Sequence, residues 1–147
     1  MDTITALQEA AGKLRASPFL IEEKRTLSYR DVDRQSNSLA LGLGQLGVGK
    51  GDRVALYMNG ASEFVISRFG VQKLGAIIVP LNTRLSAAEI EHILTECEPK
   101  CLIVEAALLG NVPERWRSRC VASAPVTTSA PDAASTMGIS SAPSGGI

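Results

Sequence analysis

Two overlapping glycine patterns are the residues of this chain whose types and spacing best match a site for chemistry. Gly42, Gly44 and Gly47 fit G-x-G-x-x-G, which binds a pyrophosphate where it follows a strand and opens a helix. Gly44 also precedes Gly49-Lys50-Gly51 at nearly the spacing of a phosphate-binding P-loop. The first pattern closes an apolar helical repeat, however, and Gly51 replaces the hydroxyl residue that would hold magnesium. We therefore interpret both patterns as a helix-to-strand turn.

The glycines of this turn are expected to supply backbone freedom instead of a phosphate cradle. We predict positive φ angles at Gly47, Gly49 and Gly51, which would let the chain reverse sharply between helix and strand. A stand-alone nucleotide-binding domain remains a hypothesis that rests only on the two glycine patterns.

The titratable side chains suggest no catalytic residue and no metal ligand. His92 is the only histidine, so a triad or metal centre lacks a second imidazole, and we expect a surface position for it. The cysteines lack the paired spacing of a zinc site, so we expect reduced thiols. The acidic residues of one helix are interpreted as a cap, Glu89, and a solvated face. The cysteines are Cys97, Cys101 and Cys120, and the acidic residues of the helix are Glu89, Glu91, Glu96 and Glu98.

Composition excludes several classes of partner. The 147 residues carry 15 basic and 15 acidic side chains, so no net field attracts nucleic acid or an anionic membrane. Only 4% of residues are aromatic, too few for a platform on which bases stack. No apolar run approaches the ~20 residues of a membrane span, and Asp2 and Glu9 argue against a signal peptide. We expect a cytoplasmic protein.

Periodic segments predict an α/β fold, with a mostly parallel sheet flanked by helices. An amphipathic helix with Ile4, Leu7, Ala11 and Leu14 on one face precedes a small hairpin, and strands then alternate with helices. Ser28, Ser62 and Ser86 are predicted to open helices, and Gly75 and Pro99 to end them. The predicted strands are 53–58, 76–80 and 101–104, and the apolar 76–80 is expected to be covered on both faces. The apolar stripe of the helix after Ser28 is Val32, Leu39, Leu43 and Leu46.

The chain changes character after Cys120. Of its last 27 residues, 21 are Ala, Ser, Pro, Thr or Gly, and Asp132 is the only charge. Such a composition buries too little apolar surface to offset the entropy of ordering. We predict one folded domain at 1–120 and a disordered tail at 121–147.

Residues 4–110 resemble the N-terminal subdomain of the adenylate-forming enzymes, which include acyl- and aryl-CoA synthetases. The resemblance rests on the order and spacing of several segments and fades before the tail. These segments are Leu27–Val32, Ser36–Ala40, Leu46–Ala55, Glu63-Phe64, Lys73–Ala76, Val79–Leu85 and Glu89. The version of Val79–Leu85 found here, with Asn82, is similar to that of the CoA synthetases. Tyr29, Asn37, Asp52 and Lys73 are family-like positions for which capping, turn formation and packing are expected.

The resemblance implies an ATP-dependent reaction in two halves. A carboxylate attacks the α-phosphate of ATP with the help of Mg²⁺, and CoA then displaces AMP from the acyl-adenylate. The arginine matching Arg84 lies near the nucleotide phosphate of CoA in such enzymes, and pairing of Arg84 with a neighbouring carboxylate is the equal alternative. The family's phosphate loop, ribose-binding aspartate and catalytic lysine have no counterpart in this sequence.

Two further hypotheses follow for the chain as a whole. The first is an N-terminal piece of an acyl- or aryl-CoA synthetase, inactive alone and binding ATP, Mg²⁺ or CoA at most weakly. A truncated or frameshifted product and an incomplete gene model are its two possible origins. The second is a non-catalytic binding or assembly module derived from that fold. The expected partner is accordingly the rest of the enzyme, with its carboxylic acid substrate, or another protein.

Overall fold

The computed structural model describes residues 2–123 and 140–141. Its helices are α1 (Thr3–Leu14), α2 (Tyr29–Gln45), α3 (Ala61–Lys73), α4 (Ala87–Cys97), the 3₁₀ helix η1 (Ala106–Asn111) and α5 (Glu114–Arg117). Its strands are β1 (Pro18–Glu22), β2 (Arg25–Ser28), β3 (Arg53–Tyr57), β4 (Ile77–Pro80), β5 (Cys101–Glu105), β6 (Cys120–Ser123) and β7 (Ser140–Ser141).

The central sheet has the strand order β4-β3-β5-β6-β7. The first four strands are parallel, and β7 pairs antiparallel with β6. Strands β1 and β2 form a separate antiparallel hairpin. The predicted hairpin and the predicted mostly parallel α/β fold are therefore confirmed.

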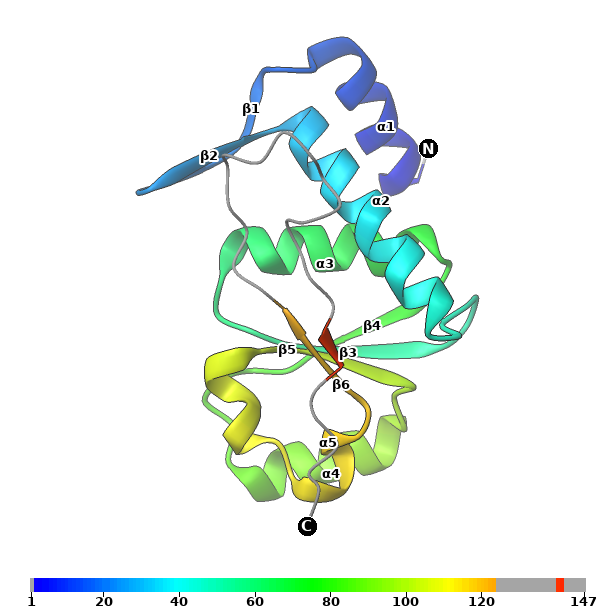
Figure 1. Cartoon of the computed structure of the whole chain (residues 1–147), viewed down its shortest axis with the longest axis vertical. Coiled ribbons are helices and arrows are strands. Elements are labelled where there is room, and N and C mark those ends of the chain that lie inside the picture. The colour runs from blue at the N-terminus through cyan, green and yellow to red at the C-terminus, as the bar shows by residue number, and fades with distance from the viewer. Residues whose placement is uncertain (1, 124–139, 142–147) are drawn as a thin grey trace.

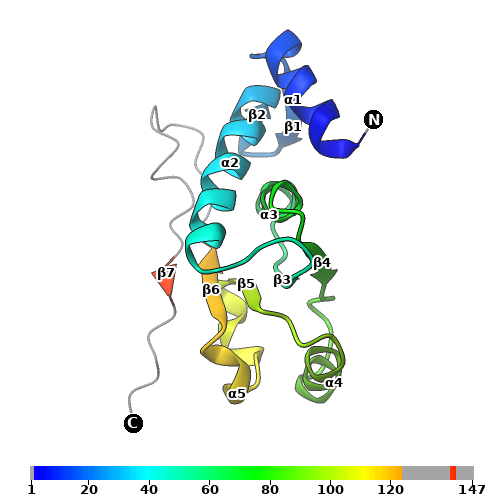
Figure 2. The same cartoon turned by 90° about the vertical axis from the view of Figure 1, so that its right-hand side faces the viewer.

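Helices cover the sheet on both faces, as Figures 1 and 2 show, with α2 and α3 on one side and α4 and α5 on the other. Two apolar clusters fill the spaces between these layers. The cluster beneath α2 and α3 contains Val54, Leu56 and Ile103, whereas Ala55, Tyr57 and Leu102 point into the cluster beneath α4 and α5. Successive residues of one strand thus enter opposite cores, which explains why β3 and β5 read as unbroken apolar runs.

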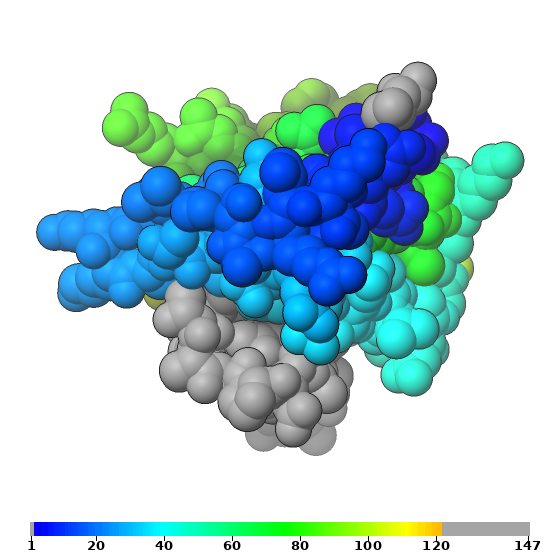
Figure 3. All heavy atoms as spheres, turned by 90° about the horizontal axis from the view of Figure 1, so that it is seen from above, coloured from blue at the N-terminus to red at the C-terminus, as the bar shows by residue number. Residues whose placement is uncertain are grey.

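Helix α1 and the hairpin lie together at one end of the molecule, with α1 in dark blue in Figure 3. Leu7 and Ala11 of α1 are buried as predicted, but Leu14 is 46% exposed because it is the last residue of the helix. None of the helices in the described part of the chain is long and apolar enough to cross a bilayer.

Two helices begin where a local capping box predicts. The Ser28 hydroxyl accepts the N–H of Asp31 (3.1 Å), whose carboxylate accepts the N–H of Ser28 (2.9 Å). Ser86 and Glu89 repeat the arrangement at α4. The predicted start of α3 at Ser62 is wrong. This helix begins at Ala61 after Gly60, and its first turn is capped from outside the helix.

Two helices end in the same hydrogen-bonded turn. Beyond α2, the N–H groups of Gly47 and Val48 donate to the carbonyls of Gly44 and Leu43, the pattern of a Schellman motif. Gly47 has a φ of 87° there, and Gly75 has a φ of 71° in the equivalent turn after α3. Gly51 is also left-handed, at 83°, but the prediction of a positive φ at Gly49 is wrong.

Strand β4 occupies the lateral edge of the sheet, and the predicted cover on both of its faces is only partial. Ile78 packs against the core beneath α2 and α3 and Val79 against the core beneath α4 and α5, both partly buried. Ile77 is 51% exposed, because no strand pairs with β4 on its outer side within the described residues. Pro80 suits such an edge, where its missing N–H costs no ladder hydrogen bond. Leu46, predicted to continue the buried stripe of α2, is 52% exposed because it lies beyond the last turn of the helix.

The segment after Glu105 contains elements that the sequence patterns did not indicate, namely η1, α5 and β6. Strand β6 crosses the predicted domain boundary at residue 120, and Val121 is buried in the core beneath α2 and α3. Apart from 121–123 and 140–141, the predicted disordered tail lies outside the described residues.

Candidate functional site

The carboxyl ends of the parallel strands form the natural place for a ligand in this architecture. From β3 the chain continues through α3 to β4, whereas from β5 it continues through η1 and α5 to β6. These connections pack against opposite faces of the sheet. Neighbouring parallel strands whose connections diverge in this way leave a crevice between their carboxyl ends, where doubly wound folds bind their ligands. The switch point of this sheet lies between the carboxyl ends of β3 and β5.

A carboxylate of the chain itself links the ends of these two strands at the switch point. Oε2 of Glu105, at the end of β5, accepts the backbone N–H of Asn59 just beyond β3 (2.7 Å). The contact occupies the Asn59 amide and places a negative charge beside it. The arrangement therefore joins the two loops and disfavours an anionic ligand.

The first turn of α3, which follows β3, also has a carboxylate of the chain on one of its amides. Oε1 of Glu22, from the hairpin, accepts the N–H of Ser62 (3.0 Å). Arg25 contacts the Glu22 carboxylate and donates to Oε1 of Glu63 (2.6 Å). The hydrogen bond from Arg25, followed by those from Ser62, holds the pKa of Glu22 below its usual value. This cluster ties the hairpin to the start of α3.

In the described part of the chain, each of the four helices longer than ten residues has a carboxylate of the chain at its N-terminus. Besides Glu22 at α3, Asp2 accepts the N–H of Thr5 at α1 (2.8 Å), and Asp31 and Glu89 complete the capping boxes of α2 and α4. Backbone hydrogen bonds lower the pKa of both Asp2 and Glu89. Helix N-termini bind phosphate through unpaired amides and a positive dipole end. At α1 and α3 a carboxylate accepts a first-turn amide, whereas at α2 and α4 the serine hydroxyl accepts that amide and the carboxylate accepts the N–H of the serine.

The glycine patterns lie at the amino ends of the parallel strands, opposite the carboxyl ends, where β3 begins. We call these two sides the amino edge and the carboxyl edge of the sheet. Gly44 and Gly47 close α2, as predicted, and Oδ2 of Asp52 accepts the N–H of Gly49 (2.8 Å). Lys100 approaches the same carboxylate oxygen (3.3 Å). The backbone hydrogen bond from Gly49, with a smaller contribution from Lys100, lowers the pKa of Asp52. Asp52 is therefore a turn residue, in agreement with its predicted role.

Arg84 is the one site residue that the sequence proposed, and it lies at the carboxyl edge. It occupies the loop between β4 and α4, where Oδ1 of Asn82 accepts its backbone N–H (2.9 Å) and orders the loop. The residue is exposed, and its guanidinium forms no ion pair with any carboxylate of residues 2–123. The structure thus supplies no carboxylate partner of the kind that the alternative interpretation requires.

Lys73 forms a buried polar centre whose extent the sequence did not reveal. Its ammonium lies 2.8 Å from Oδ1 of Asp33, 2.8 Å from Oγ of Ser36 and 2.7 Å from Oδ1 of Asn37. The Lys73 side chain is only 7% exposed. The contacts fasten the last turn of α3 to α2. The i, i+3 and i, i+4 spacing of the three acceptors from Asp33 was the available signal.

The acidic face predicted for α4 is only partly solvated. Glu91 pairs with Arg115 (2.6 Å) and accepts the indole N–H of Trp116 (3.1 Å), which corrects its assignment as a purely solvated residue. These contacts dock α5 on α4. His92 is exposed, as predicted.

The cysteines of the sheet lie where chemistry is suppressed. Cys101 points into the core beneath α2 and α3, and Cys120 into the core on the other face. Burial raises the pKa of Cys101 to about 12 and that of Cys120 to about 11. Both are therefore thiols at neutral pH, and thiols are poor nucleophiles and metal ligands.

Comparison with known proteins identifies the family. The family described as AMP-binding enzyme matches residues 7–144, which extends the resemblance well beyond residue 110, where the sequence patterns placed its end. Long-chain fatty acid transport protein 6 of Homo sapiens is 39% identical over 98 residues, 66% of this chain and 16% of that protein. The long-chain-fatty-acid–CoA ligase FadD13 of Mycobacterium tuberculosis (strain ATCC 25618 / H37Rv) is 42% identical over 80 residues, 54% of this chain and 16% of the ligase.

Solved structures agree in fold. The anthranilate CoA ligase AuaEII, in complex with anthranoyl-AMP, has a TM-score of 0.74 and 32% identity over 81% of this chain and 23% of that one. The chain thus spans less than a quarter of the length of these relatives. Taken with the parallel sheet and its helical layers, the family match shows that this chain belongs to the AMP-binding enzyme family.

Proposed function

We propose that this chain is the N-terminal scaffold of an ATP-dependent acid–CoA ligase and that it forms no adenylate by itself. The proposed inactivity rests on one observation, the presence of carboxylates at the helix N-termini. Each of the four longer helices already holds a carboxylate of the chain, from Asp2, Asp31, Glu22 and Glu89. Glu105 adds a further negative charge at the switch point of the sheet. These groups oppose the binding of a triphosphate.

In the proposed enzyme, the chemistry is supplied by parts of the longer ligase other than these 147 residues. A carboxylate attacks the α-phosphate of ATP, Mg²⁺ eases the charge of the phosphates, and the CoA thiolate then displaces AMP from the acyl-adenylate. Such catalysis depends on positioned donors and cations around the reacting phosphate. The described residues contribute a rigid sheet edge from which the β4–α4 loop projects.

Arg84 is the residue through which this scaffold is proposed to touch a substrate. Its exposed guanidinium, without a carboxylate partner in the described part of the chain, is free to bind a phosphate in a bidentate manner. We assign it to a phosphate of the CoA nucleotide, in line with the family resemblance of Val79–Leu85.

The proposal is tested by ATP–pyrophosphate exchange with the purified chain. Octanoate, palmitate, benzoate and anthranilate are offered with MgATP, and a complete CoA ligase serves as the positive control. We expect exchange at the level of the enzyme-free blank while circular dichroism shows a folded α/β protein. Exchange above the blank with any of these acids would overturn the proposed inactivity.

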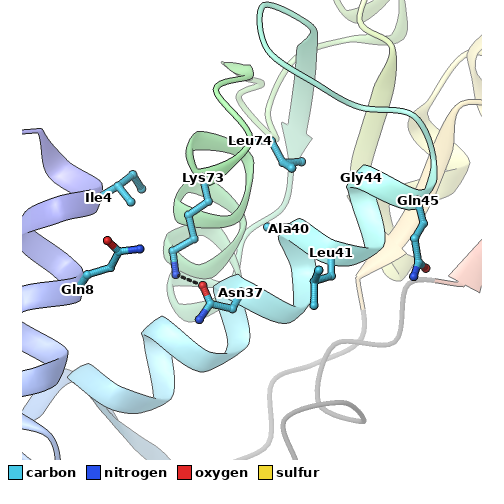
Figure 4. A pocket seen from close by; sticks show the side chains of 9 residues that line it. All are labelled: Ile4, Gln8, Asn37, Ala40, Leu41, Gly44, Gln45, Lys73 and Leu74. Atoms are coloured by element: carbon cyan, nitrogen blue, oxygen red, sulfur yellow. Dashed lines mark hydrogen bonds between the residues drawn. The ribbon is translucent and has the colours of Figure 1, made fainter.

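A second function, that of a non-catalytic binding or assembly module, is favoured by one observation. The three helices α1, α2 and α3 border an open, mainly apolar groove that the rest of the described chain leaves uncovered (Figure 4). A surface of that kind commonly marks a place where another molecule binds.

A further inference from the structure

The loop between β4 and α4, residues 81–86, is fixed at both ends and carries Arg84 between them. At its start, Leu81 is buried and donates its N–H to the carbonyl of Leu56 in β3 (2.8 Å). At its end, Ser86 is the N-cap of α4. The position of Arg84 therefore depends on the short turn that joins these two anchors.

Asn82 accepts both hydrogen bonds that close this turn. Its side-chain Oδ1 accepts the N–H of Arg84 (2.9 Å), and its main-chain carbonyl accepts the N–H of Leu85 (3.1 Å). The first contact is an Asx turn, in which a side-chain oxygen stands in for a backbone carbonyl. Asn82 thus fixes the piece of backbone from which the Arg84 guanidinium projects.

This acceptor also has no charge. An aspartate would accept the Arg84 N–H equally well, because both residue types form Asx turns. Its carboxylate, however, would stand two residues from the guanidinium, where it would pair with Arg84 and repel a phosphate. The amide of Asn82 orders the loop without that charge, and no carboxylate of residues 2–123 forms an ion pair with Arg84.

We propose that Asn82 is the positioning residue for Arg84 and that its neutral amide leaves the guanidinium available to a phosphate of CoA. The inference rests on the proposed contact of Arg84 with the CoA nucleotide. It gives Asn82 two separable tasks, to order the turn and to do so without adding charge. Asn82→Ala removes the acceptor and adds no charge, whereas Asn82→Asp keeps the acceptor and adds the charge.

¹H–¹⁵N NMR of the whole chain, titrated with CoA, measures both tasks. Without ligand, the Arg84 amide should exchange with water faster in Asn82→Ala than in the wild type, and at the wild-type rate in Asn82→Asp. The dissociation constant of CoA should rise about threefold in Asn82→Ala and at least about tenfold in Asn82→Asp. Added salt should bring the value for Asn82→Asp closer to that of the wild type, because salt screens the added charge.

Thr83→Ala is the matched control. Thr83 lies in the same turn, and its side chain forms no hydrogen bond within the described residues, so this variant should bind CoA as the wild type does. An equal loss in Thr83→Ala would overturn the inference, because any change in the loop would then suffice.

The remaining outcomes separate this inference from the proposal on which it rests. A wild-type dissociation constant in either Asn82 variant would overturn the inference and leave the contact between Arg84 and CoA standing. In particular, a purely structural Asn82 would make Asn82→Asp bind like the wild type. If CoA shifts no resonance of the wild type, the assignment of Arg84 is wrong and the inference is overturned with it, whereas the inactivity of the chain is judged separately by pyrophosphate exchange.

Discussion

The amino edge and the carboxyl edge of the parallel sheet differ in whether their polar groups have partners within the chain. At the amino edge, Gly47 and Gly75 turn helices into strands, and Asp52 holds the N–H of Gly49. At the carboxyl edge, Glu105 bridges two loops, whereas Arg84 extends into solvent without a carboxylate partner among residues 2–123. The edge with the phosphate-like sequence pattern is thus a structural one.

The difference shows that spacing alone does not make a site. At this edge Gly47 and Gly75 donate their N–H groups to helix carbonyls, Gly51 donates to the carbonyl of Gly75, and Gly49 donates to Asp52. These amides are therefore not available to a ligand. A group that binds a ligand must instead lack a hydrogen-bond partner within the fold. The free-energy penalty of leaving it unpaired is removed when the ligand binds. Arg84 meets that condition because exposure to water keeps the cost of its unpaired charge small.

Removing the Lys73 ammonium should have the largest effect on stability. Lys73 lies in the last turn of α3, which leads into the amino edge, and is 7% exposed beside Asp33. Lys73→Met leaves the carboxylate without its partner, so the free energy of unfolding should fall by about 2–3 kcal/mol in urea titrations.

Lys100→Met is the matched control for this substitution. The Lys100 side chain is 48% exposed and lies 3.3 Å from Asp52, so its loss should cost no more than about 1 kcal/mol. Equal losses for the two variants would contradict the assignment of Lys73 as a buried centre.

Glycine substitutions should change stability in opposite directions at two positions. At Gly75, φ is 71° and a Cβ would lie 3.3 Å from Lys50 Cγ, so Gly75→Ala should lower stability by about 1–2 kcal/mol. Gly12 lies inside α1 with no atom within 4 Å of a Cβ position. Gly12→Ala should therefore raise the melting temperature through a gain of about 0.5–1 kcal/mol. A neutral or stabilising effect of Gly75→Ala would contradict the left-handed, closely packed conformation of Gly75.

The parts of the fold that sequence could predict were those specified by neighbouring residues. Ser28 and Asp31 are three positions apart, as are Ser86 and Glu89, and both boxes mark helix starts correctly. The start of α3 was misplaced because its cap, Glu22, is 40 residues from Ser62. A carboxylate so distant leaves no periodic pattern.

Strand order and site geometry were equally beyond local patterns. An apolar strand reads the same at the centre of a sheet and at its edge, so the exposure of Ile77 in β4 could not be foreseen. Arg84 was identified by family resemblance, but the absence of a carboxylate partner for it among residues 2–123 follows from the three-dimensional arrangement of the loop. The contact between Glu105 and Asn59 joins residues 46 positions apart and had no local signal.

Acid should weaken the attachment of the hairpin to α3. The pKa of Glu22 is lowered in the folded state, chiefly by Arg25, so its contribution is fully present above the ordinary value of 4.5. It is lost as the pH falls below that value through the lower folded pKa. Arg25 and Glu63 are the charged groups that face it.

Glu22→Gln isolates this contribution. The variant should be about 1 kcal/mol less stable than the wild type at pH 7, and the difference should shrink as the pH falls below 4.5. Urea titrations at several pH values measure it. A difference that is constant from pH 7 to acid would mean that the charge of Glu22 plays no part.

Substitution of Arg84 should have the smallest effect on stability and a selective effect on binding. Because the side chain is exposed and unpaired within residues 2–123, Arg84→Gln should change the free energy of unfolding by less than about 0.5 kcal/mol.

In ¹H–¹⁵N NMR titrations with CoA, we expect weak, saturable shifts confined to the β4–α4 loop of the wild type, and none in Arg84→Gln. Arg84→Lys keeps the charge but loses the bidentate geometry, so intermediate shifts are expected. Pantetheine, which lacks the nucleotide phosphates, is the control ligand. Equal shifts in the wild type and Arg84→Gln would place any CoA contact elsewhere. Shifts with pantetheine would mean that the loop contacts the pantetheine part of CoA and not its nucleotide.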